Sequence, residues 1–289
     1  MILENEKLLV EIAEDGAELT RIYHKERGAE LLWNADAKYW KRHAPVLFPV
    51  VGKVYGGVTR FGGKEYAFSQ HGFARDMKFE TVKHTQTEAV LVLKASDATK
   101  EKYPFDFVLE IGYTLNGGSI RVSWKVTNAG EGQMPFTIGA HPAFALDECR
   151  GRKEDFCLEF PGKQQLNYIL LDPASGCGIP EEVYELPLSD GYLPLSEELF
   201  AKDALVVDGG QIEEAWLCNA KHERVMGLKS PGFPNYGIWS NSGAPFVCLE
   251  PWAGRADDVG YCGEMADKPG ATVLGANEVF EKAYDIVTE

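Results

Sequence analysis

The chain has 289 residues, of which 45% are hydrophobic and 25% charged, and these values are typical of a globular protein. Its formal net charge of −15 disfavours nucleic acids and anionic membranes as partners, because their phosphates would be repelled. The N-terminus is acidic and no apolar run approaches the length of a membrane span, so we expect a cytoplasmic protein that binds a neutral small molecule.

The first third of the chain predicts short strands separated by turns. Apolar and polar residues alternate over 8–13, and Asp15-Gly16 then marks a turn before a second strand at 17–23. The apolar segment 45–51 is bracketed by prolines, which cannot donate to a β-ladder, so it fits an edge strand or an inward-packed loop. A further buried strand is expected at 89–93.

The clearest local pattern is a hairpin. Residues 107–115 and 120–126 both alternate with period two, and Asn116-Gly117 between them tolerates the positive φ of a tight turn. Further strands are predicted at 156–160, 205–207, 215–218, 225–228, 236–239 and 245–249. One helix of about two turns is expected over 195–201, capped by Ser196. With no linker or change in composition, residues 1–289 predict a single all-β sandwich domain.

Several chemistries lack a sequence signature. There is no Gly-rich nucleotide-binding motif, the six histidines lie far apart, and no aromatic-laced basic patch occurs, so we expect no cofactor, no metal and no nucleic acid. The six cysteines, at 149, 157, 177, 218, 248 and 262, include no Cys-x-x-Cys pair. They are expected to be reduced thiols that are buried or half-buried.

Two titratable residues stand on apolar, proline-restrained segments. His141 precedes Pro142 within the nearly uncharged stretch 137–144, and proline holds the residue before it in an extended conformation. Glu250 precedes Pro251 in the same way, and on a strand it shares one face with Phe246, Cys248 and Trp252. Such surroundings raise a carboxyl pKa. The alternatives are a core histidine with a satisfied hydrogen bond and a glutamate paired with a buried arginine.

A third polar stretch, residues 69–76, contains His71 beside Gly72, followed by Arg75 and Asp76. It is either part of a site or a surface turn with an incidental histidine. A histidine and a carboxylate are the minimal acid and base pair, and Trp252 could stack on the C–H face of a sugar, so carbohydrate chemistry is plausible.

Three motifs in order carry a family resemblance. His-Gly-Phe-Ala-Arg at 71–75, Gly-Ala-His-Pro-Ala-Phe at 139–144 and Glu-Pro-Trp-Ala-Gly at 250–254 resemble the signature blocks of the galactose mutarotase-like (aldose 1-epimerase) superfamily, in particular its LacX-type branch. The resemblance implies a large antiparallel β-sandwich with a sugar cleft on a concave sheet. It also implies interconversion of the α and β anomers of a free hexose or related sugar through ring opening.

The resemblance also assigns roles to residues of this chain. Glu250 would be the base for the anomeric hydroxyl, His141 the acid for the ring oxygen, and His71 a group that holds and polarises the sugar. Asp203 and Arg75 would bind substrate. Lys53 stands where the family often has an arginine, and it offers a point charge without a planar fork.

The sequence leaves other functions and the assembly open. A hexose-6-phosphate 1-epimerase would need a basic cluster at the cleft, for which Lys53, Arg60, Arg75 and Arg255 are candidates. A non-catalytic carbohydrate-binding protein would bind sugar without any effect on rate. A glycosidase would need a second carboxylate beside Glu250, and Asp203 is the candidate. The chain is compatible with a monomer or a homodimer.

Overall fold

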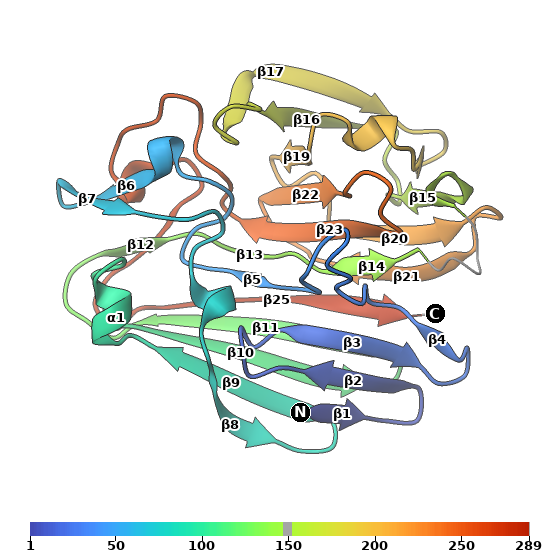
Figure 1. The fold of residues 1–289 in the computed structure, drawn as a ribbon, viewed down its shortest axis with the longest axis horizontal. Coiled ribbons are helices and arrows are strands. Elements are labelled where there is room, and N and C mark those ends of the chain that lie inside the picture. Colours follow the sequence, from blue (N-terminus) through green and yellow to red (C-terminus); the bar gives the residue numbers. More distant parts are fainter. Residues whose placement is uncertain (147–151, 289) are drawn as a thin grey trace.

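The computed structural model describes residues 1–146 and 152–288, and antiparallel β-sheets dominate it (Figure 1). This confirms the predicted all-β sandwich class. The largest sheet has nine strands, in the order β18 (Tyr192–Pro194), β15 (Phe156–Glu159), β20 (Glu214–Asn219), β21 (Arg224–Lys229), β25 (Val279–Thr288), β11 (Ser119–Asn128), β10 (Phe107–Asn116), β9 (Glu88–Lys94) and β8 (Glu80–His84).

An eight-stranded sheet forms the second large layer. Its strand order is β17 (Gly178–Pro187), β16 (Gln165–Leu171), β19 (Leu205–Asp208), β22 (Asn235–Trp239), β23 (Phe246–Ala253), β13 (Ile138–Ala140) and β5 (Val46–Leu47), with β14 (Ala143–Ala145) also paired to β23. The proline-bracketed segment 45–51 therefore contributes an edge strand, as the sequence allowed.

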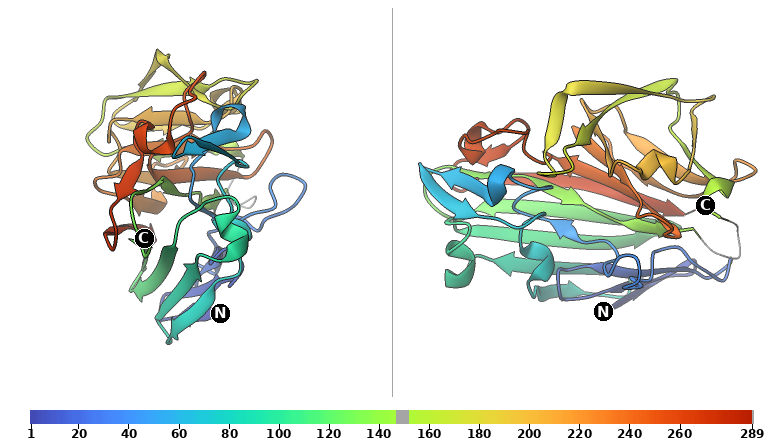
Figure 2. Two further views of the ribbon diagram at one scale, coloured as in Figure 1. Left: turned by 90° about the vertical axis from the view of Figure 1, so that its left-hand side faces the viewer. Right: turned by 45° about the horizontal axis from the view of Figure 1, so that its top comes forward.

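Smaller sheets complete the fold. They are the four-stranded sheet β1 (Ile2–Glu4), β2 (Leu8–Ile12), β3 (Leu19–His24) and β4 (Ala29–Glu30), the pair β6 (Val58–Phe61) and β7 (Lys64–Ala67), and the pair β12 (Met134–Phe136) and β24 (Thr272–Leu274). Figure 2 shows the layers from two further sides, with β1–β4 and the β16–β17 hairpin at opposite ends of the molecule.

The predicted hairpin forms as expected. Strands β10 and β11 pair without a register shift from Phe107 opposite Asn128 to Asn116 opposite Ser119. Gly117 in the turn has a φ of 57°, which explains the glycine. Every second residue of β10 is buried, so this face packs into a hydrophobic cluster that draws on residues from Leu3 to Ile286.

Strand β23 is buried on both faces, and successive side chains point alternately into the main hydrophobic cluster and to the opposite face of the sheet. Val247, Leu249 and Ala253 join the main hydrophobic cluster. The alternate residues, among them Glu250 and Trp252, point to the other face of the sheet, as the sequence predicted. The face of β23 that carries Glu250 therefore points away from the main hydrophobic cluster and toward a cavity.

The helix prediction needs correction. The helix expected over 195–201 is only a short 3-10 turn, Glu198–Phe200, although Ser196 Oγ accepts a hydrogen bond from Leu199 N at 3.2 Å as a cap would. The helix ends because Asp203 adopts a φ of 76° and the chain enters β19. A single helical turn, α1 (Asp97–Lys100), forms instead where none was predicted.

The cysteines largely follow expectation. Within residues 1–146 and 152–288 the five cysteines are free thiols, and Cys157, Cys177, Cys218 and Cys248 are buried. Cys262 is exposed, which corrects the expectation that all would be covered, because it lies in a surface loop. Cys149 lies outside the described residues. Across the described ranges, no helix combines the length and the apolar character needed to cross a membrane.

Candidate active site

His141 and Glu250 are cross-strand neighbours. Gly139 of β13 pairs with Trp252, and Ala143 of β14 pairs with Cys248, so the unshifted register places His141 opposite Glu250. The ladder is interrupted at this point because Pro142 has no N–H, but its carbonyl still accepts from Leu249 N at 3.3 Å. Two residues that are distant in sequence are thus held side by side on one face of the sheet.

The two side chains form a close, secluded contact. His141 Nε2 lies 3.4 Å from Glu250 Oε2, and the glutamate side chain is only 2% exposed. The imidazole stacks on Trp40 with ring centroids 4.7 Å apart and meets the Trp239 ring edge-on at 5.6 Å. Among the described residues, neither His141 Nδ1 nor Glu250 Oε2 has a hydrogen-bond partner, and both atoms are buried.

Burial shifts both pKa values toward the neutral forms. Desolvation, with the nearby positive charge of Arg75, lowers the pKa of His141 to about 3. Desolvation and the negative charge of Asp203 raise the pKa of Glu250 well above 4.5, against a smaller opposing effect of the Trp252 N–H. A strongly perturbed acid and base in contact within a cavity is typical of a functional site.

His71 sits in a tight turn and has a defined tautomer. Its backbone is left-handed, with a φ of 68°, and its N–H donates to Gly52 O at 2.8 Å. The amide of Gly52 in turn donates to His71 Nδ1 at 3.0 Å. Because Nδ1 accepts, the neutral ring carries its proton on Nε2. Burial and the neighbouring His141 and Arg75 hold the pKa of His71 well below 6.5, so this N–H is a neutral donor.

A cavity of about 520 Å³ opens above these side chains. The Trp252 indole forms part of its lining and donates its Nε1–H to Ala140 O at 3.2 Å. It can lie flat across the sheet because its neighbours are glycines: an added Cβ at Gly139 or Gly237 would come within 2.5 or 2.3 Å of the ring. The cavity is large enough for a monosaccharide-sized ligand.

One wall of the cavity is basic despite the acidic chain. Arg42 and Arg75 line it, together with the exposed Lys41. Arg75 donates Nη2–H to Gln70 O at 2.6 Å, and burial lowers its pKa to about 10. Arg42 pairs with Asp76 at 2.7 Å. Positive charge is thus concentrated on the side of the cavity nearest the two histidines.

Most of the predicted site residues meet in this cavity. It is lined by His71, Arg75, His141, Asp203, Glu250 and Trp252, whose roles stay predictions. Lys53 does not join them: its side chain is exposed, packs beside Gly176 and borders a neighbouring hollow with Tyr55 and Asp172. Arg60 is also remote, since it binds Glu65 and the carbonyl of Cys262.

Sequence reasoning missed several lining residues. Trp40 and Arg42 come from the irregular segment between β4 and β5, and Trp239 ends strand β22. The only available signal was the dense aromatic and basic run Tyr39-Trp40-Lys41-Arg42. Arg255, which the sequence offered as an anion binder, is instead committed to Asp208 at 2.8 Å and Asp258 at 2.5 Å.

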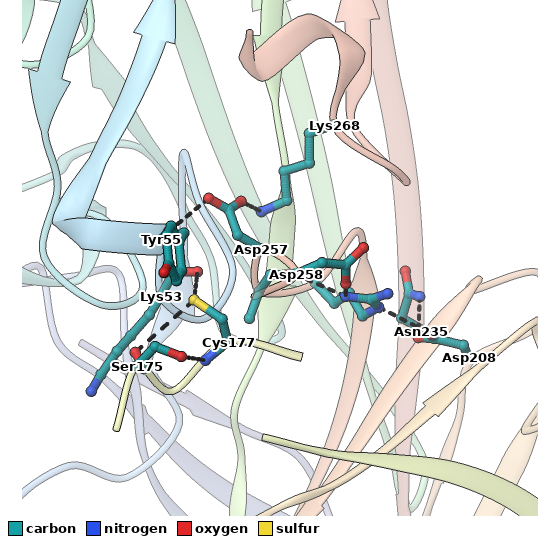
Figure 3. Close-up of polar contacts among 11 residues, drawn as sticks. Lys53, Tyr55, Ser175, Cys177, Asp208, Asn235, Asp257, Asp258 and Lys268 are labelled. Atoms are coloured by element: carbon teal, nitrogen blue, oxygen red, sulfur yellow. Dashed lines mark hydrogen bonds and ion pairs between the residues drawn. The ribbon is translucent and has the colours of Figure 1, made fainter. Parts of the chain in front are cut away.

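A buried polar network supports the chain that follows β23 (Figure 3). Asp257 Oδ1 contacts Lys268 Nζ at 2.8 Å, and its Oδ2 accepts from Tyr55 N at 2.8 Å. The amide of Asp257 donates to Lys53 O at 3.0 Å. Lys53 and Tyr55 lie one and three residues after Gly52, whose amide donates to His71 Nδ1, so this network anchors the loop that orients His71.

One group of described side chains has metal-ligating potential. The donor atoms of His141, Cys248 and Glu250 all lie within 4.8 Å of one another. The remaining lining residues offer hydrogen-bond donors, carboxylates and aromatic faces, which suit a polyhydroxylated ligand.

Comparison with solved structures places this architecture among galactose mutarotase-like folds. A galactose mutarotase related enzyme from Lactobacillus acidophilus is 30% identical with a TM-score of 0.94, and the match covers 100% of this chain and 97% of that one. A galactose mutarotase-like protein from Lactobacillus casei is 32% identical with a TM-score of 0.91, covering 100% and 99%.

Sequence comparison defines the family. The plasmid-encoded protein LacX of Lactococcus lactis subsp. lactis is 32% identical over 303 residues, covering 98% of this chain and 97% of that protein. The model of the aldose 1-epimerase family matches residues 1–169. The chain belongs to the aldose 1-epimerase family, as its three motifs predicted.

Proposed function

We propose that the protein is an aldose 1-epimerase that interconverts the α and β anomers of a free hexose or a related sugar. The observation that carries this proposal is the 3.4 Å contact between His141 Nε2 and Glu250 Oε2 at the cavity wall. Mutarotation moves protons at two oxygens bonded to the same carbon, the anomeric hydroxyl and the ring oxygen. An acid and a base that act on both must therefore lie within hydrogen-bond reach of one anomeric centre, and two adjacent side chains on the cavity wall can do so.

One mobile proton on the pair is sufficient for the reaction. Burial favours neutral imidazole and protonated carboxyl. Transfer of that proton from Glu250 to His141 across their contact gives a carboxylate and an imidazolium. Sugar hydroxyls that donate to the carboxylate stabilise this charged form, because hydrogen bonds to an ionised group favour ionisation.

Ring opening then uses each group once. The Glu250 carboxylate takes the proton of the anomeric hydroxyl, the bond from C1 to the ring oxygen breaks, and His141 protonates that oxygen. Rotation about C1–C2 turns the aldehyde, and the reverse proton transfers close the ring on its other face. Each general acid or base step contributes roughly 10²–10⁴ in rate. The Nε2–H of His71 and the carboxylate of Asp203 hold sugar hydroxyls, and Trp252 packs against the ring.

The proposal is tested with Glu250→Gln, which keeps the shape of the side chain but cannot take a proton. Polarimetry of freshly dissolved α-glucose and α-galactose should show acceleration by the wild-type protein and none by the variant. Binding of the sugars, measured by calorimetry, should persist in both. Full activity in the variant would remove Glu250 from the mechanism, and binding without acceleration by the wild type would establish a non-catalytic carbohydrate-binding protein.

A hexose-6-phosphate 1-epimerase is the second candidate, and Arg42 and Arg75 on the cavity wall favour it. Arg42 is already paired with Asp76, which reduces the charge available to a phosphate. The two candidates differ in their response to inorganic phosphate. Phosphate should compete with a phosphorylated substrate, and Arg75→Gln should then raise KM for the sugar phosphate by a larger factor than KM for the free hexose.

A further inference from the structure

Two side chains at the cavity wall and one buried thiol form a potential ligand set that the proposed reaction uses only in part. His141 faces Glu250 across the strand pair, and Cys248 precedes Glu250 by two residues, so all three project from the same face of the sheet. Ala143, which pairs with Cys248, packs with the thiol and Phe246 in one buried cluster. No two of the three donor atoms are more than 4.8 Å apart.

We propose that His141, Cys248 and Glu250 bind Zn²⁺. Zinc–nitrogen and zinc–oxygen bonds of about 2.0–2.2 Å at a tetrahedral angle place two ligand atoms about 3.4 Å apart. His141 Nε2 and Glu250 Oε2 are already separated by 3.4 Å. With a zinc–sulfur bond of about 2.3 Å, the thiol must lie about 3.5 Å from the other ligands. Since no two donor atoms are more than 4.8 Å apart, shortening the longest separation by at most about 1.3 Å completes the set.

One polar atom of the site lacks a partner, whereas the Cys248 thiol must lose a proton to bind zinc, because burial and Glu250 raise its pKa well above 9. Glu250 Oε2 is fully buried and has no hydrogen-bond partner in the part of the chain that the structure describes. Zinc would satisfy this atom, and a thiolate together with a carboxylate neutralises the charge of the ion. Since His141 and Glu250 also line the cavity, we expect the fourth tetrahedral position to face that space and the ion to enter from it. Three protein ligands and one open position are typical of zinc sites that exchange their fourth ligand.

The ligand types predict selectivity. A thiolate and an imidazole suit Zn²⁺ and Co²⁺, whereas Mg²⁺ and Ca²⁺ prefer sites made of oxygen atoms. A bound Zn²⁺ would occupy both the acid and the base, so it would inhibit mutarotation in competition with sugar; this consequence rests on the proposed function. The binding site itself does not, because the metal can be followed by spectroscopy.

The site is tested by titrating the full chain, stripped of metal, with Co²⁺, which reports thiolate coordination through a charge-transfer band. We expect one equivalent of Co²⁺ to produce this band and Zn²⁺ to displace it, with no response to Mg²⁺. Cys248→Ser and Cys248→Ala should both abolish the band. The double variant C157S/C218S, which removes another pair of buried thiols, should retain it.

The same variants separate the metal site from the reaction. Cys248→Ser keeps His141 and Glu250, so its mutarotation should match the wild type but resist Zn²⁺. A band that survives in both Cys248 variants, or no band in the wild type, would overturn the zinc site. If the wild type shows the band but no mutarotation, the zinc site stands and the proposed function fails.

Discussion

The buried ion pair between Asp257 and Lys268 gives a sharp prediction about stability. The two side chains are 3% and 2% exposed and their charged atoms lie 2.8 Å apart. Lys268→Met removes the cation and leaves the Asp257 carboxylate without its countercharge in a dry environment. Breaking a buried pair in this way costs about 3–5 kcal/mol. For a chain of this size we expect a melting temperature about 6–10 °C lower.

The assay is urea unfolding at neutral pH, and two matched variants control it. D257N/K268M removes both charges, and it should recover most of the loss because a neutral pair of similar shape carries no buried charge. Lys78→Met breaks an exposed pair with Glu14, whose charged atoms lie 3.1 Å apart, and should cost less than about 1 kcal/mol. The reasoning is refuted if K268M loses no more than K78M, or if the double variant is no more stable than K268M.

Three further predictions concern the cavity. The pKa of Glu250 in the folded protein lies above 4.5, so the folded state becomes less stable relative to the unfolded state as the pH rises above 4.5. Glu250→Gln should therefore be equally stable as the wild type at pH 4 but more stable at pH 8, by about 1.4 kcal/mol per unit of pKa shift. Equal stability of the two proteins at both pH values would contradict the raised pKa. Trp40→Leu should let water reach His141 and raise its pKa from about 3 toward 6.5, as followed by NMR titration; an unchanged pKa would show that the stacked ring does not exclude water. Gly237→Ala places a Cβ 2.3 Å from the Trp252 ring. The variant should lose about 1–3 kcal/mol of unfolding free energy, measured in urea, and should bind sugar more weakly. A variant that matches the wild type in both measurements would show that the position of the indole is unimportant.

The sequence predicted strands best where one face is buried and the other polar. The β10–β11 hairpin was predictable because strict alternation and a glycine turn coincide. Strand β25 was missed, although it lies in the middle of the nine-stranded sheet. Its alternate positions include Glu281, Ala283 and Asp285, and several of its residues are only half-buried, so hydrophobic periodicity is weak. Its place depends on pairing with β11, which is a long-range contact.

The site was predictable in part for a similar reason. His141 and Glu250 stood out because charged groups are rare in apolar, proline-restrained segments. That they face each other follows from strand register, which their own neighbours in sequence do not determine. Trp40 and Arg42 lie in an irregular segment whose side chains follow no period. Lys53 was placed by resemblance alone, and the backbone after Gly52, with its φ of 71°, directs that lysine to a neighbouring hollow.

The central claim, that His141 and Glu250 move protons at the anomeric centre, is tested most directly by exchange NMR of a hexose at equilibrium. Magnetisation transferred between the α and β anomeric protons reports the catalysed rate in both directions. The wild type should produce strong transfer, and Glu250→Gln and His141→Gln should each reduce it to the level of buffer while still binding sugar. Transfer by both variants at the wild-type rate would contradict the account.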